Sequence, residues 1–210
     1  MFFWICFSIL FLPIMLLLPT KVVNKKNMPK RKKQNVIVCC NHTSNFDAVV
    51  LDIRLRHKLY YLSKKEMFKN KFFGFFLKKL GCIKVDRSKP DITAIKTCLK
   101  TLNEGKNLGV FPQGTRGQEG DIDVATVKDG VAVFSLRTGK PVLPMALVRK
   151  PKIFRRNMLV VGELIYPDME RSKDKVYAEE FTALIVKQMN DLRHQGEELL
   201  YKKKKAKKGN

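Results

Sequence analysis

Residues 36–47 consist of an apolar run, Val36-Ile37-Val38-Cys39-Cys40, followed directly by a polar one, Asn41-His42-Thr43-Ser44-Asn45-Phe46-Asp47. A short apolar run rich in β-branched side chains predicts a strand buried in a sheet. The polar residues therefore follow the carboxyl end of a strand, where open α/β sheets place their sites. His42 is a candidate proton acceptor near neutral pH, and Asp47 is a candidate partner for one of its ring nitrogens.

Strand-like and helix-like segments alternate along the rest of the chain. The predicted strands are residues 36–40, 59–62, 82–85, 108–111, 142–147 and 158–164, and the predicted helices are residues 46–56, 64–80, 92–103, 126–138 and 176–200. This order predicts one α/β domain over residues 34–200, with a mostly parallel sheet covered by helices. A chain of 210 residues has room for one such domain and is short for two.

The first twenty residues carry no charge and are mostly Phe, Ile and Leu. Twenty helical residues measure about 30 Å, the thickness of the hydrocarbon core of a bilayer. Residues 1–20 are therefore predicted to form a membrane-anchoring helix, with a buried core helix as the alternative. Pro13 leaves open whether this helix crosses the bilayer or lies in one leaflet. Residues 21–33 form a basic juxtamembrane linker, which predicts that the domain behind it faces the cytoplasm.

Positive charge dominates the composition. The sequence has 42 Lys and Arg against 19 Asp and Glu, a net charge of +23, which requires an anionic partner such as a lipid surface, a phosphorylated substrate, an acidic carrier or nucleic acid. Residues 201–210 form a lysine-rich tail that is expected to be disordered and to bind anionic lipid. Residues 64–80 combine phenylalanines with lysines, so this helix either packs on the sheet or lies in the membrane interface.

Two further segments carry groups suited to a phosphate. In the first, Phe111-Pro112-Gln113-Gly114-Thr115-Arg116, the glycine lets the backbone approach a ligand, and Thr115 and Arg116 offer a hydroxyl and a planar fork for phosphate oxygens. The second, Gly81-Cys82-Ile83-Lys84-Val85-Asp86-Arg87, is a short strand that ends in an arginine. Each arginine taken alone also fits a solvated surface charge.

The order of these segments resembles that of the 1-acylglycerol-3-phosphate acyltransferases, part of the glycerolipid acyltransferase superfamily. Their motifs N-H-x-x-x-x-D, G-x-I-x-x-x-R and F-P-E-G-T-R-S match the segments that begin at Asn41, Gly81 and Phe111, and a V-P-V motif matches the residues around Pro144. In both, a hydrophobic N-terminus precedes the motifs. The resemblance covers residues 1–165 and implies the glycerolipid acyltransferase fold.

The resemblance implies transfer of a fatty acyl group from an acyl thioester to the free hydroxyl of lysophosphatidate, which gives phosphatidate. His42 would act as the general base and Asp47 would orient the imidazole, so no protein nucleophile is needed and Cys39 and Cys40 are core residues. Substrate phosphate would be bound by Arg87, Gly114, Thr115 and Arg116, and the site would be supported by Asn41 and Gln113.

The expected partners are membrane lipids, the lysophospholipid substrate, and a thioester of acyl carrier protein or coenzyme A. Both donors are acidic, so the net charge fits either. No cofactor, metal or nucleic acid is expected. The same chemistry on another lysolipid or an amino-acid-derived lipid stays open, because shared motifs report the chemistry better than the acceptor. A remoter alternative is a membrane-tethered basic module that binds nucleic acid or anionic lipid without catalysis.

Two positions depart from the family pattern: Gln113 replaces a glutamate, and Gly117 replaces a serine. Glutamine keeps a hydrogen-bond acceptor but cannot balance the charge of Arg116, which is therefore expected to be freer to bind phosphate. His57 and His194 show no metal-ligand spacing and are expected on the surface. The five cysteines include no C-x-x-C pair, which indicates reduced thiols.

Overall fold

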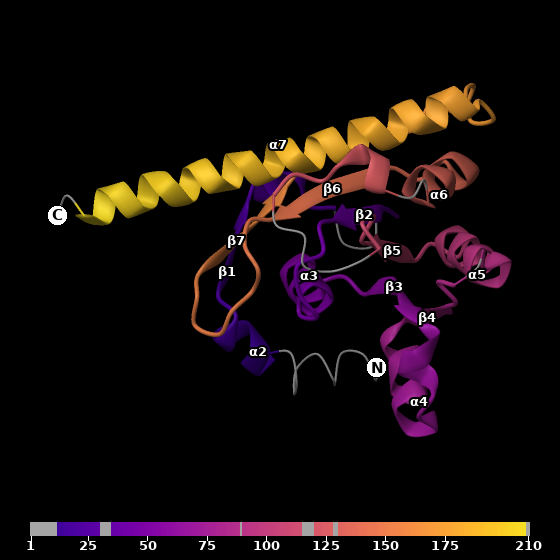
Figure 1. Cartoon of the computed structure of the whole chain (residues 1–210), viewed down its shortest axis with the longest axis horizontal. Helices are drawn as coiled ribbons and strands as arrows, with labels where there is room; N and C mark the ends of the chain where they lie inside the picture. The colour runs from indigo at the N-terminus through magenta and orange to yellow at the C-terminus, as the bar shows by residue number, and fades with distance from the viewer. Residues whose placement is uncertain (1–11, 30–34, 89, 115–119, 128–129, 209–210) are drawn as a thin grey trace.

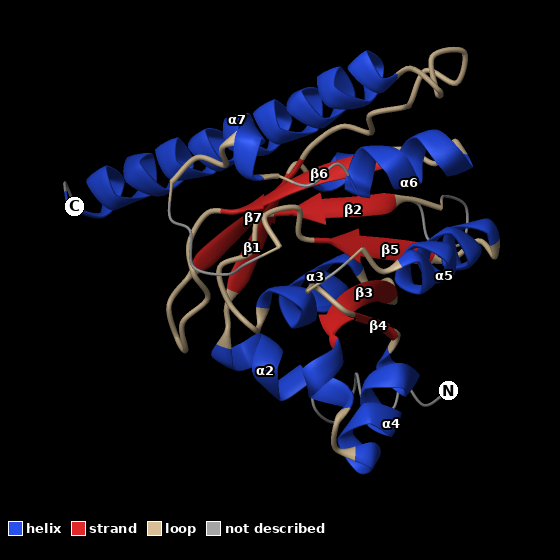
Figure 2. Cartoon of the chain, turned by 45° about the vertical axis from the view of Figure 1, so that its right-hand side comes forward, coloured by secondary structure: helices blue, strands red, loops and turns tan. Residues whose placement is uncertain are grey.

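A sheet of seven strands organises the part of the chain that the computed structural model describes, residues 12–29, 35–88, 90–114, 120–127 and 130–208 (Figures 1 and 2). The strand order is β1-β7-β6-β2-β5-β3-β4. The strands are β1 (Thr20–Val23), β2 (Ile37–Cys40), β3 (Leu59–Lys64), β4 (Cys82–Val85), β5 (Asn107–Val110), β6 (Val142–Leu147) and β7 (Asn157–Val161).

The direction of the strands changes once across the sheet. Strands β6, β2, β5, β3 and β4 pair in parallel, whereas β7 runs antiparallel to β6 and carries β1 in parallel at its outer edge. The predicted α/β class with a mostly parallel sheet is therefore confirmed. The carboxyl ends of the five parallel strands share one edge, which is where the predicted site residues begin.

Helices cover both faces of the sheet, as the sequence predicts. They are α3 (Asp47–Leu55), α4 (Lys71–Leu80), α5 (Ile92–Asn103), α6 (Gly130–Thr138) and α7 (Lys175–Lys208), with short 3-10 helices η2 (Lys25–Asn27), η3 (Lys65–Phe68) and η4 (Val124–Thr126). Alternate residues of β2 face the two layers: Ile37 and Cys39 pack with α5, α6 and α7, whereas Val38 and Cys40 pack with α3. All four are fully buried, as expected for a central parallel strand.

The N-terminal region differs from its prediction where the structure describes it. Helix α2 (Leu12–Leu17) ends before residue 20, and Thr20 begins β1. The amide of Asn157 donates to the carbonyl of Pro19 at 2.9 Å, which joins this turn to the sheet. The boundary predicted at residue 20 is therefore too late, and β1 takes up part of the predicted linker. Residues 1–11 of the predicted membrane helix lie outside the described residues, and no helix among those described is long and apolar enough to cross a bilayer.

The largest differences in helix bounds concern two predicted helices. The predicted helix 64–80 is interrupted, because Asn70 has an extended backbone and its side chain accepts a hydrogen bond from the amide of Phe73 at 3.0 Å, which caps α4. At the C-terminus, α7 continues to Lys208, so disorder is the wrong prediction for residues 201–208. Lysine and alanine are good helix formers, and they extend a helix that is already nucleated. Figure 1 shows α7 along one side of the molecule, with α2 and α4 at the opposite end.

His57 is the one histidine whose predicted environment is wrong. It lies after α3, is only 8% exposed, and its Nδ1 donates to the carbonyl of Leu55 at 2.7 Å. Arg56 before it has a left-handed backbone, which turns the chain back into the core. His194 is half exposed beside Asp121, as predicted.

Candidate active site

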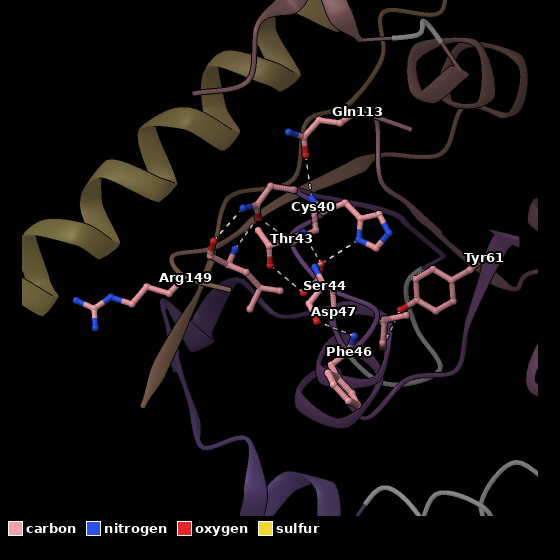
Figure 3. A network of polar contacts seen from close by, with 12 residues as sticks. Cys40, Thr43, Ser44, Phe46, Asp47, Tyr61, Gln113 and Arg149 are labelled. Atoms are coloured by element: carbon pink, nitrogen blue, oxygen red, sulfur yellow. Dashed lines mark hydrogen bonds and ion pairs between the residues drawn. The ribbon is translucent and has the colours of Figure 1, made fainter. Parts of the chain in front are cut away.

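The loop between β2 and α3 brings His42 and Asp47 together. Nδ1 of His42 lies 2.9 Å from Oδ2 of Asp47, which is completely buried at the first turn of α3. The same carboxyl oxygen accepts hydrogen bonds from the amides of Thr43 at 2.6 Å and Ser44 at 2.7 Å, and the Thr43 hydroxyl donates to Oδ1 at 3.1 Å. Figure 3 shows Thr43 and Ser44 gathered around Asp47. The negative carboxylate also suits the amino end of a helix.

These contacts decide which nitrogen of His42 carries the proton. A carboxylate oxygen can only accept hydrogen bonds, and Oδ2 of Asp47 accepts from two amides as well as from the imidazole. Nδ1 of His42 is therefore the donor in this contact. Nε2 is then left with its lone pair and can accept a proton. The His42 side chain is 17% exposed, so a substrate can reach it from outside.

Aromatic rings hold the imidazole from the side of β5. The ring of Phe111 stacks on His42 with centroids 4.2 Å apart and planes at 15°, and Tyr61 lies parallel to Phe111 at 5.8 Å. The Tyr61 hydroxyl is 3.1 Å from Oδ1 of Asp52 in α3, and burial raises the pKa of both groups. The imidazole is therefore fixed through its ring face as well as through Nδ1.

The Tyr61 ring lies in space that a glycine leaves open. Gly109 pairs with Tyr61 across β5 and β3, and a Cβ at Gly109 would come within 2.2 Å of that ring. Sequence reasoning missed Tyr61, Gly109 and the stacking role of Phe111. The available signal was the spacing of Gly109 and Phe111, because alternate residues of a strand point to the same face.

Asn41 and Gln113 both support the loop through the backbone. The Asn41 amide pairs with Leu147 at the end of β6: its Nδ2 donates to the Leu147 carbonyl at 2.9 Å, and its Oδ1 accepts from the Leu147 amide at 2.7 Å. Oε1 of Gln113 accepts from the amide of His42 at 2.9 Å (Figure 3). That bond needs only an acceptor oxygen, which glutamine and glutamate share. A glutamine at this position is therefore compatible with the geometry of the loop.

The paired cysteines of β2 are core residues. Cys39 and Cys40 are fully buried free thiols on opposite faces of the sheet, and burial raises the pKa of each well above its usual range. Burial also raises the pKa of Cys98 to about 12. A thiol must lose its proton to act as a nucleophile, so none of these three is suited to attack a carbonyl.

Arg87 and Gly114 meet although they belong to different segments. Arg87 follows β4, and its Nη1 donates to the carbonyl of Gly114 in the turn after β5. Gly114 has a φ of 66°, a left-handed conformation that favours glycine. Two of the predicted phosphate-binding residues are thus adjacent. The other two, Thr115 and Arg116, lie outside the described residues.

A groove of about 810 Å³ lies beside the contact between Arg87 and Gly114. Phe111, Gln113, Gly114 and Arg87 line one part of it, next to the His42 loop. The rest is mainly apolar and is lined by Leu62, Val85, Ala94, Ile95, Val110, Val131 and Phe134. Such a groove can hold an amphiphilic molecule that has an anionic end and a hydrocarbon chain.

Two carboxylates also line the groove, and other groups hold both. Asp86 lies 2.6 Å from Nζ of Lys65, and this contact, with the hydrogen bonds from Ser88, lowers the pKa of Asp86. Asp91 caps α5 by accepting from the amide of Ala94 at 2.9 Å. Their charges are therefore partly compensated. Among the described residues, no group of three or more His, Cys, Asp or Glu side chains is arranged to hold a metal ion.

Comparisons with known proteins point to one family. The sequence model of the acyltransferase family matches residues 19–148. The 1-acyl-sn-glycerol-3-phosphate acyltransferase of Bacillus subtilis is 35% identical over 153 residues, which are 70% of this chain and 73% of the relative. The enzyme of the same name from Borreliella burgdorferi is 30% identical over 66% of this chain, which spans about half (54%) of that relative.

A solved structure shares the fold. The crystal structure of the 1-acyl-sn-glycerophosphate acyltransferase of Thermotoga maritima superposes with a TM-score of 0.63 and 22% identity, covering 86% of this chain and 71% of its own. The match of the family model, which spans more than half of the 210 residues, includes the His42–Asp47 loop and the Phe111–Gly114 turn. The chain therefore belongs to the acyltransferase family.

Proposed function

We propose that the protein transfers a fatty acyl group from an acyl thioester to the free hydroxyl of lysophosphatidate and so makes phosphatidate. The names of its relatives support this reaction. The observation that carries it is the contact of 2.9 Å between Nδ1 of His42 and the buried carboxyl of Asp47, which leaves Nε2 to accept a proton.

In this mechanism the acceptor hydroxyl gives its proton to Nε2 of His42 as its oxygen attacks the thioester carbonyl. Asp47 holds the tautomer and stabilises the imidazolium that forms. The tetrahedral intermediate then collapses: the carbon–sulfur bond breaks, the new ester remains, and the imidazolium returns the proton to the departing thiolate. No protein nucleophile takes part, in agreement with the buried thiols of Cys39 and Cys40.

The acceptor phosphate is assigned to the end of the groove where Arg87 meets Gly114. Thr115 and Arg116, which follow Gly114 in the sequence, are proposed to bind the phosphate as well. Arginine and backbone groups at a turn suit phosphate oxygens. Binding the phosphate there would place the neighbouring hydroxyl toward His42 and convert two separate molecules into an oriented pair. The apolar lining of the groove supports an acyl chain as part of the ligand.

The donor is the thioester of acyl carrier protein or of coenzyme A, and the charge of +23 suits both. The acceptor could also be another lysolipid or an amino-acid-derived lipid, because the site performs the same chemistry on any suitably placed hydroxyl.

The enzyme is proposed to work on a membrane with its catalytic domain toward the cytoplasm. The uncharged residues 1–20 and the basic residues 21–33 support this placement. Helix α4 supports it further, because Phe72 is 84% exposed and Phe75 is 58% exposed next to lysines of the same helix. Solvent-exposed phenylalanines at this density suit an apolar surface rather than water.

One assay tests the reaction. Purified full-length protein is incubated with radiolabelled acyl-coenzyme A or acyl carrier protein thioester and with a panel of lysolipids and hydroxylated amino-acid lipids. We expect labelled phosphatidate from lysophosphatidate with one of the donors. Product from a different acceptor alone would move the proposal to that acceptor. The absence of any product, together with tight and salt-sensitive DNA binding, would replace the enzyme with a basic binding module.

A further inference from the structure

We propose that the loop between β6 and β7, residues 149–156, docks on the surface of an anionic lipid bilayer. This loop reads Arg149-Lys150-Pro151-Lys152-Ile153-Phe154-Arg155-Arg156, with five basic residues and no acidic one. The inference rests on the proposed membrane association and adds a second contact, far in sequence from residues 1–20. Below, these residues are called the 149–156 loop.

The tip of the 149–156 loop exposes large apolar side chains. Phe154 is 76% exposed and Ile153 is 61% exposed, and basic residues precede and follow them directly. Exposed apolar groups surrounded by lysine and arginine match a bilayer interface, where acyl chains meet anionic headgroups. None of the described carboxylates forms an ion pair with a basic residue of this loop.

Hydrogen bonds hold the loop in this exposed form. Phe154 has a φ of 57°, a left-handed conformation that is rare for an aromatic residue. Its amide donates to the carbonyl of Leu17 at 2.7 Å, and the amide of Arg155 donates to the carbonyl of Lys152 at 3.1 Å. At the start of the loop, Oδ1 of Asn157 accepts a hydrogen bond from the amide of Arg149, and Nδ2 of Asn157 donates to the carbonyl of Arg149. The fold thus maintains a strained backbone that points an aromatic ring outward, a feature that commonly marks a functional position.

The neighbouring segment is also apolar and exposed. Leu17, whose carbonyl accepts the hydrogen bond from the Phe154 amide, is 37% exposed, and Leu16 beside it is 73% exposed. Both belong to α2, the described end of the predicted membrane segment. Figure 1 shows the 149–156 loop, in orange, reaching down to α2. We group Leu16, Leu17, Ile153 and Phe154 as one apolar patch, whose two leucines belong to residues 1–20, the proposed anchor.

The base of the loop borders the candidate active site. Arg149, Lys150 and Arg155 line a cavity of about 350 Å³ together with Asn41 and Thr43, the two residues that flank His42. Figure 3 shows the Arg149 side chain directed toward α7, on the other side of Thr43 from Tyr61. Docking of the loop would thus set the His42 loop at a fixed position above the lipid surface, from which a lipid substrate enters.

Tryptophan fluorescence tests the contact directly. Trp4 is the only tryptophan, so the full chain with Trp4→Phe provides a background into which Phe154→Trp is introduced. On vesicles of phosphatidylglycerol, we expect a blue shift of the emission and quenching by brominated acyl chains. The matched control is Tyr166→Trp in the same background, because Tyr166 is an aromatic residue that is 64% exposed outside the patch; its emission should not be quenched.

Binding strength gives a second measurement. Lys152→Gln and Arg156→Gln should each weaken binding to phosphatidylglycerol vesicles, measured by co-sedimentation, about fivefold. Each basic residue near an anionic surface contributes a binding free energy that corresponds to a factor of this size. Lys173→Gln, at an exposed lysine outside the loop, is the control and should not change binding. Acyl transfer on detergent-dispersed substrate should be unchanged in all three variants.

The two proposals fail in different ways. Unshifted and unquenched emission from the Phe154→Trp variant, in protein that co-sediments with the vesicles, would overturn the loop contact and leave the anchor and the enzyme untouched. Protein that does not co-sediment at all would overturn the membrane association and the loop contact together. A failure of acyl transfer with every acceptor bears on the proposed reaction alone, because neither vesicle measurement depends on turnover.

Discussion

The His42 loop and the Arg87 side of the groove reach their geometry by different routes. In the loop, the partners His42 and Asp47 are five residues apart, and one strand-to-helix connection supplies most of the contacts of the carboxyl group. On the other side, Arg87 meets Gly114 across 27 residues of sequence, through two separate strands. His42, the proposed general base, is therefore positioned by local sequence, whereas the proposed phosphate site depends on contact between segments that follow two different strands. Changes in the first region should affect the chemical step, and changes in the second should affect binding of the acceptor.

Replacing His42 should have the largest effect. His42→Ala removes the proposed general base, so kcat should fall by about 10²- to 10⁴-fold. The far-UV circular dichroism and vesicle binding should be unchanged, because the side chain is partly exposed and touches the fold mainly through Phe111 and Asp47. Retention of wild-type turnover with the purified variant would falsify the proposed mechanism.

Replacing Arg87 should weaken binding of the acceptor instead. A hydrogen bond to a charged group contributes about 1.5–3 kcal/mol, so Arg87→Ala should raise the KM for lysophosphatidate about 10- to 150-fold. The kcat at saturation should change much less. Arg87→Lys is the matched control: it keeps the charge but loses the planar fork, so its KM should lie between those of the wild type and Arg87→Ala. An effect confined to kcat would show that Arg87 does not bind the acceptor phosphate.

Enlarging Gly109 tests the support behind the base. In Gly109→Ala the new Cβ would lie 2.2 Å from the Tyr61 ring, so the ring must move. Overpacking of this kind costs about 1–3 kcal/mol, which urea unfolding would detect. Because Tyr61 packs on Phe111 and Phe111 on His42, kcat should fall as well. Gly105→Ala is the control without a steric overlap, because a Cβ there would meet no atom within 4 Å. Gly105, unlike Gly109, has a positive φ, so this variant should lose some stability to backbone strain but leave kcat unchanged.

The difference between the two regions also explains what the sequence could predict. The strand 37–40 and the approach of His42 to Asp47 follow from periodicity and from a short, fixed spacing, so both were within reach of sequence reasoning. The stacking of Tyr61 on Phe111 was not, because it depends on the pairing of β3 with β5, two segments that are far apart in the chain. The interruption at Asn70 was missed because the apolar pattern continues through it, and a single capping side chain decides where the helix begins.

The smallest expected effect concerns Gln113, which joins the two regions. Its Oε1 accepts from the His42 amide, and its side chain lines the groove near Gly114 and Arg87. Gln113→Glu keeps the acceptor oxygen, so kcat should stay within about threefold of the wild type, less than the cost of a lost hydrogen bond. The added negative charge should raise the KM for lysophosphatidate several-fold, because it faces the proposed phosphate site, and less so at high salt. Gln113→Ala provides the contrast, since it removes the acceptor and should lower kcat. If the KM for the acceptor did not change in Gln113→Glu, the charge at this position would not influence the phosphate, and the contact with His42 would be its whole role.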